Sequence, residues 1–196
     1  MIDDKYTYPD SGGVLVNHFG LRDAGALDHA LNAIASAEWA SMLAEGLPPE
    51  FTFDTLGEIH RHLFSEILPF AGELRDVDAQ AVGAGIVYCR PDFISPALNG
   101  AFAKLHRRDC LVDLDADAFA AGLADHWGEL SAIHPFRDGN TRSQCVYVSA
   151  LAVAAGHPIR WQIVDVDQLR AQRLAAVSGD EGPLTDYIRS VLGSTD

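Results

Sequence analysis

Apolar residues are spaced at helical intervals along almost the whole chain, and this feature limits the folds it can adopt. Between residues 23 and 44, leucine, isoleucine, alanine and methionine residues recur at intervals that place them on one face of a helix. Comparable patterns cover residues 54–67, 95–105, 115–130, 140–155, 165–177 and 183–191. We therefore expect an all-α protein, built as a helical bundle.

Most of these segments begin with residues that favour helix N-termini. Short polar side chains can accept a hydrogen bond from the first-turn N–H groups, and proline is tolerated at the first helical position. The residues that we expect to cap or open helices are Asp54, Ser95 with Pro96, Asp115 or Asp117, Asp165 and Pro183.

One stretch, residues 72–88, departs from the helical pattern. It contains three glycines, alternates weakly, and includes the turn-forming run Gly83-Ala84-Gly85. We interpret it as a short β-hairpin. No repeat or linker interrupts the chain, so we expect one domain over residues 1–196, with an N-terminal segment (1–22), a first helix and loop (23–52) and a core (53–192).

The charge and the apolar runs exclude several classes of protein. There are 28 acidic and 14 basic side chains, a net charge of -14, whereas nucleic-acid and anionic-membrane binders need a basic surface. The most apolar run, residues 146–155, is about half the length that spans a bilayer. The acidic start lacks a signal pattern, and the three cysteines form no CxxC pair. We expect a cytoplasmic protein that binds neither nucleic acid nor membrane.

The segment at residues 134–142 is far more polar than its flanks. Pro135 and Gly139 exclude a continuous helix through it. Gly139 and Asn140 can adopt positive φ, which lets successive backbone N–H groups point into one concavity at the start of the next helix. A helix N-terminus carries partial positive charge and unpaired donors, and is therefore a ready site for an anion.

The side chains of this segment suit phosphate chemistry. Arg142 offers a planar fork for phosphate oxygens, and Asp138 can hold a magnesium ion that bridges to them. His134 titrates near neutrality and can serve as a general base. The residues alone thus indicate a phosphate-binding loop with a base. The alternative is a polar loop whose Asp138 and Asn140 only cap the next helix.

The segment resembles the signature of the Fic (Fido) family, HPFx(D/E)GN(G/K)RxxR. The residues that match in register are His134, Pro135, Phe136, Asp138, Gly139, Asn140 and Arg142. Residues 53–72, with IHRHLF and LPFAG, resemble the helix and junction that precede the Fic flap, and residues 73–90 resemble the flap. The likeness covers residues 53–192.

This resemblance implies a single Fic-fold bundle with a small β-hairpin flap. Most Fic proteins transfer AMP from ATP to a hydroxyl group of a target protein. The resemblance makes His134 the base that deprotonates the target Ser, Thr or Tyr and Asp138 the magnesium ligand. The residues that it assigns to phosphate binding are Gly139, Asn140, Thr141 and Arg142. The flap residues that would hold the target by strand addition are Val82, Gly83, Ala84, Gly85 and Ile86.

Two positions depart from the family pattern. Thr141 stands where glycine is usual, and Cys145 stands where the family has a second arginine that engages the distal phosphates. Cysteine supplies neither the positive charge nor the bidentate guanidinium of arginine, so we expect weaker nucleotide binding unless another arginine compensates. Arg137, Arg160 or Arg173 could take over this role.

The family pattern also suggests how such an enzyme is regulated. Ser41, Glu45 and Gly46 formally match the inhibitory pattern (S/T)xxxE(G/N), but at the end of the first helix rather than on a separate one. Near the C-terminus, Val177 occupies the Ser/Thr position ahead of Glu181. We therefore expect a small helical antitoxin that supplies an inhibitory glutamate.

The sequence therefore predicts a protein adenylyltransferase, either a toxin held by an antitoxin or an effector domain delivered into another cell. Two alternatives stay open. One is a catalytically weakened Fic domain, which Cys145 motivates. The other is transfer of another phosphate-containing group, as in the Doc branch, although that branch has lysine at the Thr141 position and alanine at Gly139. We also expect His60 and His62 to be a partly exposed pair rather than metal ligands.

Overall fold

The computed structural model describes residues 4–81 and 83–193, which form seven α-helices and two short 3₁₀ turns. The helices are α1 (Ala24–Glu45), α2 (Phe53–Phe64), α3 (Pro91–His106), α4 (Ala116–Ile133), α5 (Asn140–Ala154), α6 (Val166–Val177) and α7 (Gly182–Val191). The turns are η1 (Asp109–Leu111) and η2 (Trp161–Ile163). The predicted all-α bundle is confirmed, since no sheet forms among the described residues.

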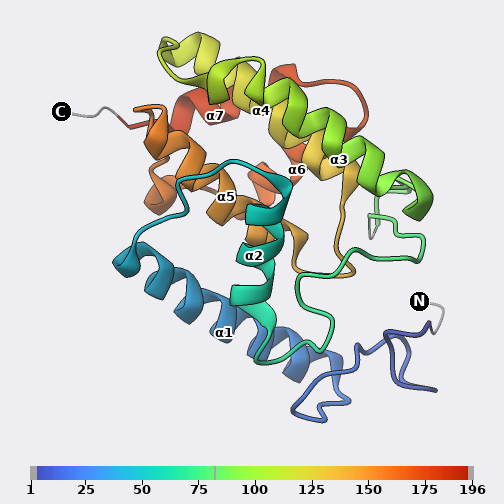
Figure 1. The fold of residues 1–196 in the computed structure, drawn as a ribbon. Helices are drawn as coiled ribbons and strands as arrows, with labels where there is room; N and C mark the ends of the chain where they lie inside the picture. Colours follow the sequence, from blue (N-terminus) through green and yellow to red (C-terminus); the bar gives the residue numbers. More distant parts are fainter. Residues whose placement is uncertain (1–3, 82, 194–196) are drawn as a thin grey trace.

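Helices α4 and α5 form the centre of the bundle. Helix α4 packs against α3, α6 and α7, while α5 packs against α2 and α4, and α1 lies on the outer side of α2 (Figure 1). Side chains of α4 and α5 such as Trp127, Phe119 and Tyr147 have almost no exposed surface. The connection between these two central helices is therefore held on a rigid base.

Most of the expected helix starts are confirmed. The side chains of Asp115 and Asp165 accept hydrogen bonds from the N–H groups of Ala118 and Gln168, as N-caps do. Helix α7 begins at Gly182 with Pro183 in its first turn.

Two expected starts are wrong. Thr52, not Asp54, caps α2, because the Thr52 hydroxyl accepts from the N–H of Thr55 while Asp54 lies in the first turn. Helix α3 begins at Pro91 and continues through Ser95 and Pro96, at the cost of one interior N–H donor.

The expected β-hairpin at residues 72–88 is reduced to one antiparallel bridge, between Gln80 and Val87. Two backbone bonds flank this bridge, from the N–H of Ala81 to the carbonyl oxygen of Ile86 (2.8 Å) and from the N–H of Tyr88 to that of Ala79 (3.0 Å), and beyond them the limbs bond elsewhere. The N–H of Cys89 donates to the carbonyl oxygen of Ala132 in α4 (2.9 Å), and the carbonyl of Val77 accepts from Arg75. The segment between α2 and α3 is therefore a loop anchored to the end of α4.

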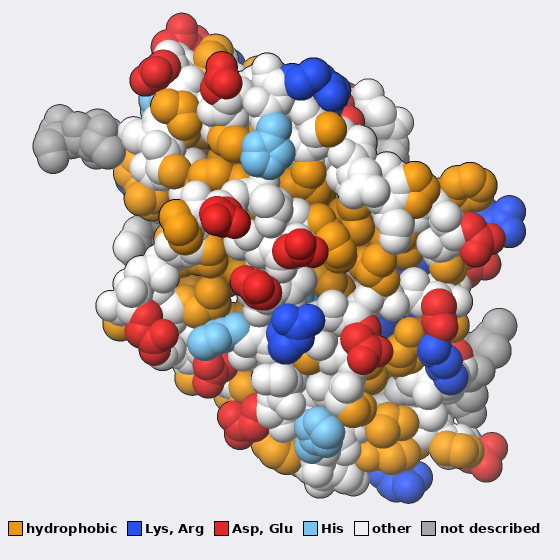
Figure 2. Space-filling model, viewed as in Figure 1, with side chains coloured by type: hydrophobic (Ala, Val, Ile, Leu, Met, Phe, Trp, Pro, Cys, Tyr) orange, Lys and Arg blue, Asp and Glu red, His pale blue; other side chains and the backbone are white. Residues whose placement is uncertain are grey.

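The surface agrees with the acidic composition. Acidic side chains are spread among apolar ones over the face shown in Figure 2. Within residues 4–81 and 83–193, no helix is long and apolar enough to cross a bilayer.

Candidate active site

The connection between α4 and α5 is shaped by two residues with left-handed backbone. His134 ends α4 with φ 49° and ψ 63°, and Gly139 precedes α5 with φ 75°. At Gly139 a Cβ atom would lie 2.5 Å from Cε2 of Phe64, so both the conformation and the space require glycine.

The interior of this connection is tied together by its own side chains. Phe136 has no exposed surface, and the side chain of buried Asn140 bonds to both backbone groups of Phe136, accepting at 2.9 Å and donating at 2.7 Å. The Asn140 amide thus fixes the shape of the connection, while its backbone N–H lies in the first turn of α5.

His60 is completely buried beneath the connection, so the expectation of a partly exposed pair with His62 is wrong for this residue. Its Nδ1 accepts from the N–H of Gly72 (2.8 Å), which leaves Nε2 to donate to the carbonyl oxygen of Asp138 (2.8 Å). Burial lowers the pKa of His60 to about 4, so the ring is neutral and acts as a structural bridge. One signal was available in the sequence, because His60 follows Leu56 by four residues on the apolar face of α2.

Arg75 joins the α2–α3 loop to the end of α4. It is 2% exposed, and its guanidinium donates to the carbonyl oxygens of His134 (2.7 Å), Val77 (2.7 Å), Ile133 (3.1 Å) and Cys89. A cation suits these carbonyls, since two of them end helix α4 and carry its negative dipole end. Sequence reasoning missed Arg75, because its partners lie far from it along the chain.

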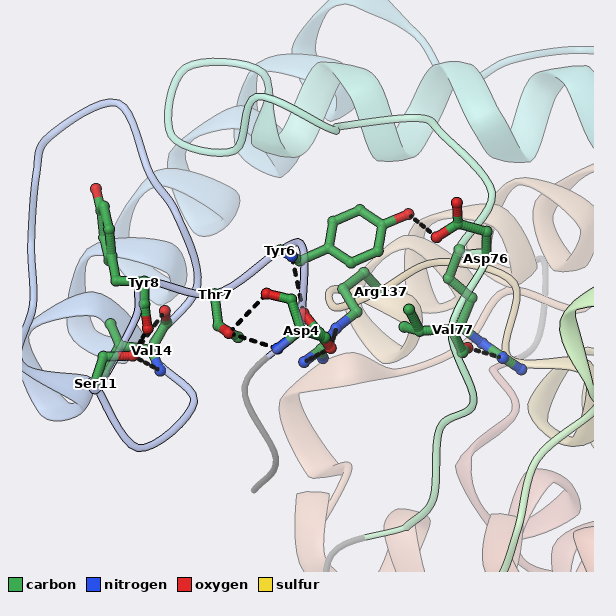
Figure 3. Close-up of polar contacts among 10 residues, drawn as sticks. Asp4, Tyr6, Thr7, Tyr8, Ser11, Val14, Asp76, Val77 and Arg137 are labelled. Atoms are coloured by element: carbon green, nitrogen blue, oxygen red, sulfur yellow. Dashed lines mark hydrogen bonds and ion pairs between the residues drawn. The ribbon is translucent and has the colours of Figure 1, made fainter.

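The N-terminal segment braces the same region from outside (Figure 3). Asp4 forms an ion pair with Arg137 (3.0 Å), and the hydroxyl of Tyr6 donates to the carboxylate of Asp76 (2.9 Å), which Lys5 also contacts. Arg137 is thereby engaged with the N-terminal segment, and it is not among the residues that line the cavity described below.

The His134 side chain is half-buried and stacked. Its ring is parallel to that of Tyr88, with centroids 3.8 Å apart. Burial, and then the charges of Arg173 and Arg75, lower the pKa of His134 to about 3. The imidazole is therefore neutral at physiological pH.

Asp138 and Arg142 lie side by side at the start of α5. The guanidinium of Arg142 approaches the Asp138 carboxylate at 3.3 Å, donates to Oδ1 of Asn32 (3.0 Å), and lies over the ring of Phe64. The Asp138 side chain is 35% exposed and can be reached from solvent.

A cavity of about 540 Å³ opens beside these residues. Its walls are mostly apolar and include Trp39 and Trp161, which meet edge to face at 5.3 Å. The residues at its motif end include His134, Thr141, Arg142, Cys145, Arg170 and Arg173. This size is within the range of small-molecule sites.

The comparisons with known proteins agree with this geometry. The model of the Fic/DOC family matches residues 50–152. This chain belongs to the Fic/DOC family. Over 193 residues it is 30% identical to the probable protein adenylyltransferase y4lH of Sinorhizobium fredii, covering 97% of both chains. It is also 30% identical over 186 residues to the probable protein adenylyltransferase Fic of Escherichia coli, covering 93% of this chain and 87% of that protein.

The fold is that of solved Fic domains. The BepC protein of Bartonella tribocorum, a VirB-translocated effector whose crystal structure holds AMPPNP, superposes with a TM-score of 0.90 at 23% identity, covering 97% of both chains. At this identity the likeness concerns the fold.

The structure brings most of the sequence-predicted residues of the Fic motif together. His134, Thr141 and Arg142 line one cavity, while Gly139 and Asn140 shape the adjoining helix start. None of the four described flap residues lines that cavity. Gly83, Ala84 and Gly85 are exposed, Ile86 is half-buried, and Val82 lies outside the described residues. The ring of His134 is contacted from this loop by Tyr88, whereas Arg75 contacts the His134 carbonyl oxygen.

Of the three arginines that the sequence left open as substitutes for the second motif arginine, Arg173, on α6, is the one that lines this cavity. It is 6% exposed, and its Nη1 donates to the Thr141 hydroxyl at 2.8 Å. A usable signal existed, because Arg173 follows Leu169 by four residues and precedes Ala176 by three, which puts a cation on the buried face of α6. Arg160 is not among the residues of this cavity, and it donates to the carbonyl oxygen of Ser190.

Proposed function

We propose that this Fic protein is a protein adenylyltransferase, which transfers AMP from ATP to a Ser, Thr or Tyr hydroxyl of a target protein. One observation carries the proposal. A neutral imidazole, a helix N-terminus and three arginines open onto one cavity of nucleotide size. No carboxylate is among the described residues that line it, although the chain has a net charge of -14. The names of the relatives support the same activity.

The start of α5 is the part suited to the phosphates. The first-turn N–H groups of a helix have no intrahelical acceptor, and Gly139, Asn140 and Thr141 present theirs where the dipole favours an anion. Arg142 adds a charged fork from the same turn. The Asn140 amide contributes indirectly, because it fixes the shape of the connection.

His134 would take the proton of the target hydroxyl. As its oxygen bonds to the α-phosphorus, the bond from phosphorus to the pyrophosphate oxygen breaks and the proton passes to the imidazole. The lowered pKa keeps the ring unprotonated and able to accept. The negative phosphates offset the arginine charges that lower this pKa, so we expect nucleotide binding to make His134 more basic.

Asp138 fits a magnesium ion that arrives with the nucleotide. No group of three or more His, Cys, Asp or Glu residues within residues 4–81 and 83–193 could hold a metal alone. Magnesium, however, is commonly held by one or two carboxylates plus substrate phosphates, and Asp138 supplies one reachable carboxylate. When bound, the ion would neutralise charge that develops on the phosphates.

Regulation would come from a separate protein. The Glu45 carboxylate accepts from the Ser41 hydroxyl at 3.0 Å, and Glu45 does not line the cavity, which speaks against self-inhibition by this pattern. A small helical antitoxin would instead insert a glutamate near Arg142. The enzyme would act as a toxin or effector in a cytoplasm that supplies ATP.

Intact-mass measurement tests the activity. The wild-type protein and His134→Ala are each incubated with ATP, magnesium and cell lysate, and the masses of the lysate proteins are measured by mass spectrometry. A gain of AMP that disappears with His134→Ala supports the proposal. A gain of phosphate alone would indicate transfer of another group, and no gain would indicate a weakened domain.

A further inference from the structure

The two departures from the Fic motif meet at one side chain. The hydroxyl of Thr141, where the family has glycine, accepts a hydrogen bond from Nη1 of Arg173. Cys145, where the family has its second arginine, is buried and lines the same cavity as Arg173. Both positions are on α5, whereas Arg173 comes from α6. The replacement residues thus accommodate an arginine that enters from another helix.

The bonding of Arg173 leaves its charge without a counter-ion. Its Nε donates to the Ser131 hydroxyl (3.0 Å), Nη1 to Thr141 (2.8 Å) and Nη2 to the side-chain oxygen of Gln144 (2.7 Å). All three acceptors are neutral, and no described carboxylate pairs with this guanidinium. Burying an unpaired charge is costly, which favours an anion as the missing partner.

The guanidinium also has donors to spare. Arginine carries five N–H groups, and the three bonds just described leave two, one on each terminal nitrogen, with no described acceptor. The Trp127 ring covers the group at 5.5 Å. The arrangement fixes the position of the guanidinium and leaves two N–H donors that can bind a ligand in the cavity.

The other arginines near the motif are differently engaged. Arg137 pairs with Asp4, and Arg75 donates to four backbone carbonyls. Arg142 approaches Asp138. Arg173 combines burial, a place in the cavity wall and neutral partners.

We infer that Arg173 supplies, from α6, the second guanidinium that the motif lacks at position 145, and that it contacts the distal phosphates of bound ATP. The inference rests on the proposed function. Cys145 is buried and uncharged in the wall of the same cavity, whereas arginine there would place two like charges in that wall.

Calorimetric titration with ATP plus magnesium, and separately with AMP, tests the inference. Arg173→Met should weaken ATP binding roughly tenfold to a hundredfold, the range for a lost charge-assisted contact, and leave AMP binding nearly unchanged. Arg160→Met, which removes a cation outside the cavity, is the matched control. Cys145→Arg combined with Arg173→Met restores the family arrangement and should recover most of the ATP affinity.

The outcomes separate this inference from the proposed function. If the wild-type protein does not bind ATP, the proposed function and the role of Arg173 are both wrong. If it binds ATP and folded Arg173→Met binds equally well, or loses ATP and AMP affinity alike, only the role of Arg173 is overturned. If Arg173→Met does not fold, an NMR measurement on the wild-type protein tests the same contact. The Nε–H resonance of Arg173 should shift with ATP and not with AMP, and equal shifts would contradict the inference.

Discussion

The ring of Tyr88 lies parallel to that of His134, with centroids 3.8 Å apart and 3° between the planes. Tyr88 belongs to the loop between α2 and α3, and its neighbour Cys89 is bonded to Ala132 and to Arg75. The loop therefore covers one face of the proposed base directly. Its position sets both the orientation of the imidazole and its exposure to water.

Replacing Tyr88 by alanine should change the titration of His134. Burial is the largest cause of its lowered pKa, so uncovering the ring should raise the pKa from about 3 toward the ordinary 6.5. The transfer rate should fall roughly tenfold to a hundredfold as the ring loses its orientation. An NMR titration of the His134 ring protons and a labelling assay measure the two effects.

Tyr88→Phe is the control for this change. It keeps the stacked ring, so it should retain both the low pKa and the rate. A His134 pKa that stays near 3 in Tyr88→Ala would show that the stacking does not shield the base.

Asp138→Asn should abolish the effect of magnesium on ATP binding. The substitution preserves the shape of the side chain and removes the one carboxylate of the connection. ATP affinity is measured with and without magnesium. Asp54→Asn, an exposed carboxylate on α2, should keep the wild-type difference. If Asp138→Asn also keeps it, Asp138 has only a structural role.

The sequence predicted the features that depend on residues close together in the chain. Apolar spacing located every helix, and the family motif located the α4–α5 connection. The errors at Asp54 and Ser95 arose because neighbouring residues compete to start a helix, and backbone geometry decides among them. The predicted hairpin assumed that its limbs would pair along their whole length, whereas they pair only around the Gln80–Val87 bridge and otherwise bond to Arg75 and α4.

The remaining site residues required tertiary structure. Arg75 acts on His134 across 59 positions and Arg173 on Thr141 across 32. No local pattern encodes either contact. The sequence named Arg173 as one of three possible substitute arginines, and its place on the apolar face of α6 favours it, because a buried cation needs partners from other elements.

Arg75→Met should destabilise the protein strongly. The change leaves four backbone carbonyls without their buried donor, and unmet buried groups cost about 1–3 kcal/mol each, so we expect a loss of about 3 kcal/mol or more. Urea unfolding gives the free energy, and hydrogen exchange at the Cys89 amide should report a freed loop. Arg107→Met, at an exposed site, should have little effect. A loss no larger than that of Arg107→Met would refute the bridging role.

His126 should make the stability of the fold depend on pH. It is 3% exposed within α4, and its Nε2 lies 3.3 Å from the Tyr147 hydroxyl. Burial lowers its pKa from 6.5 to about 4, despite an opposing effect of Asp125. Between these values the unfolded chain binds a proton that the folded chain does not, so stability is complete above pH 6.5 and is lost as the pH falls toward 4. The full effect is on the order of 3 kcal/mol.

Urea unfolding at pH 7.5 and pH 5 measures this contribution. About 2 kcal/mol of it should be lost over that interval, since roughly 1.5 pH units separate 6.5 from 5. His126→Phe removes the titrating group. Between pH 7.5 and pH 5, the free energy of unfolding of this variant should therefore fall by about 2 kcal/mol less than that of the wild-type protein. His29→Phe, at an exposed site on α1, should retain the wild-type dependence. An equal loss of stability in His126→Phe and wild type would show that His126 takes up its proton in the folded protein as readily as in the unfolded chain.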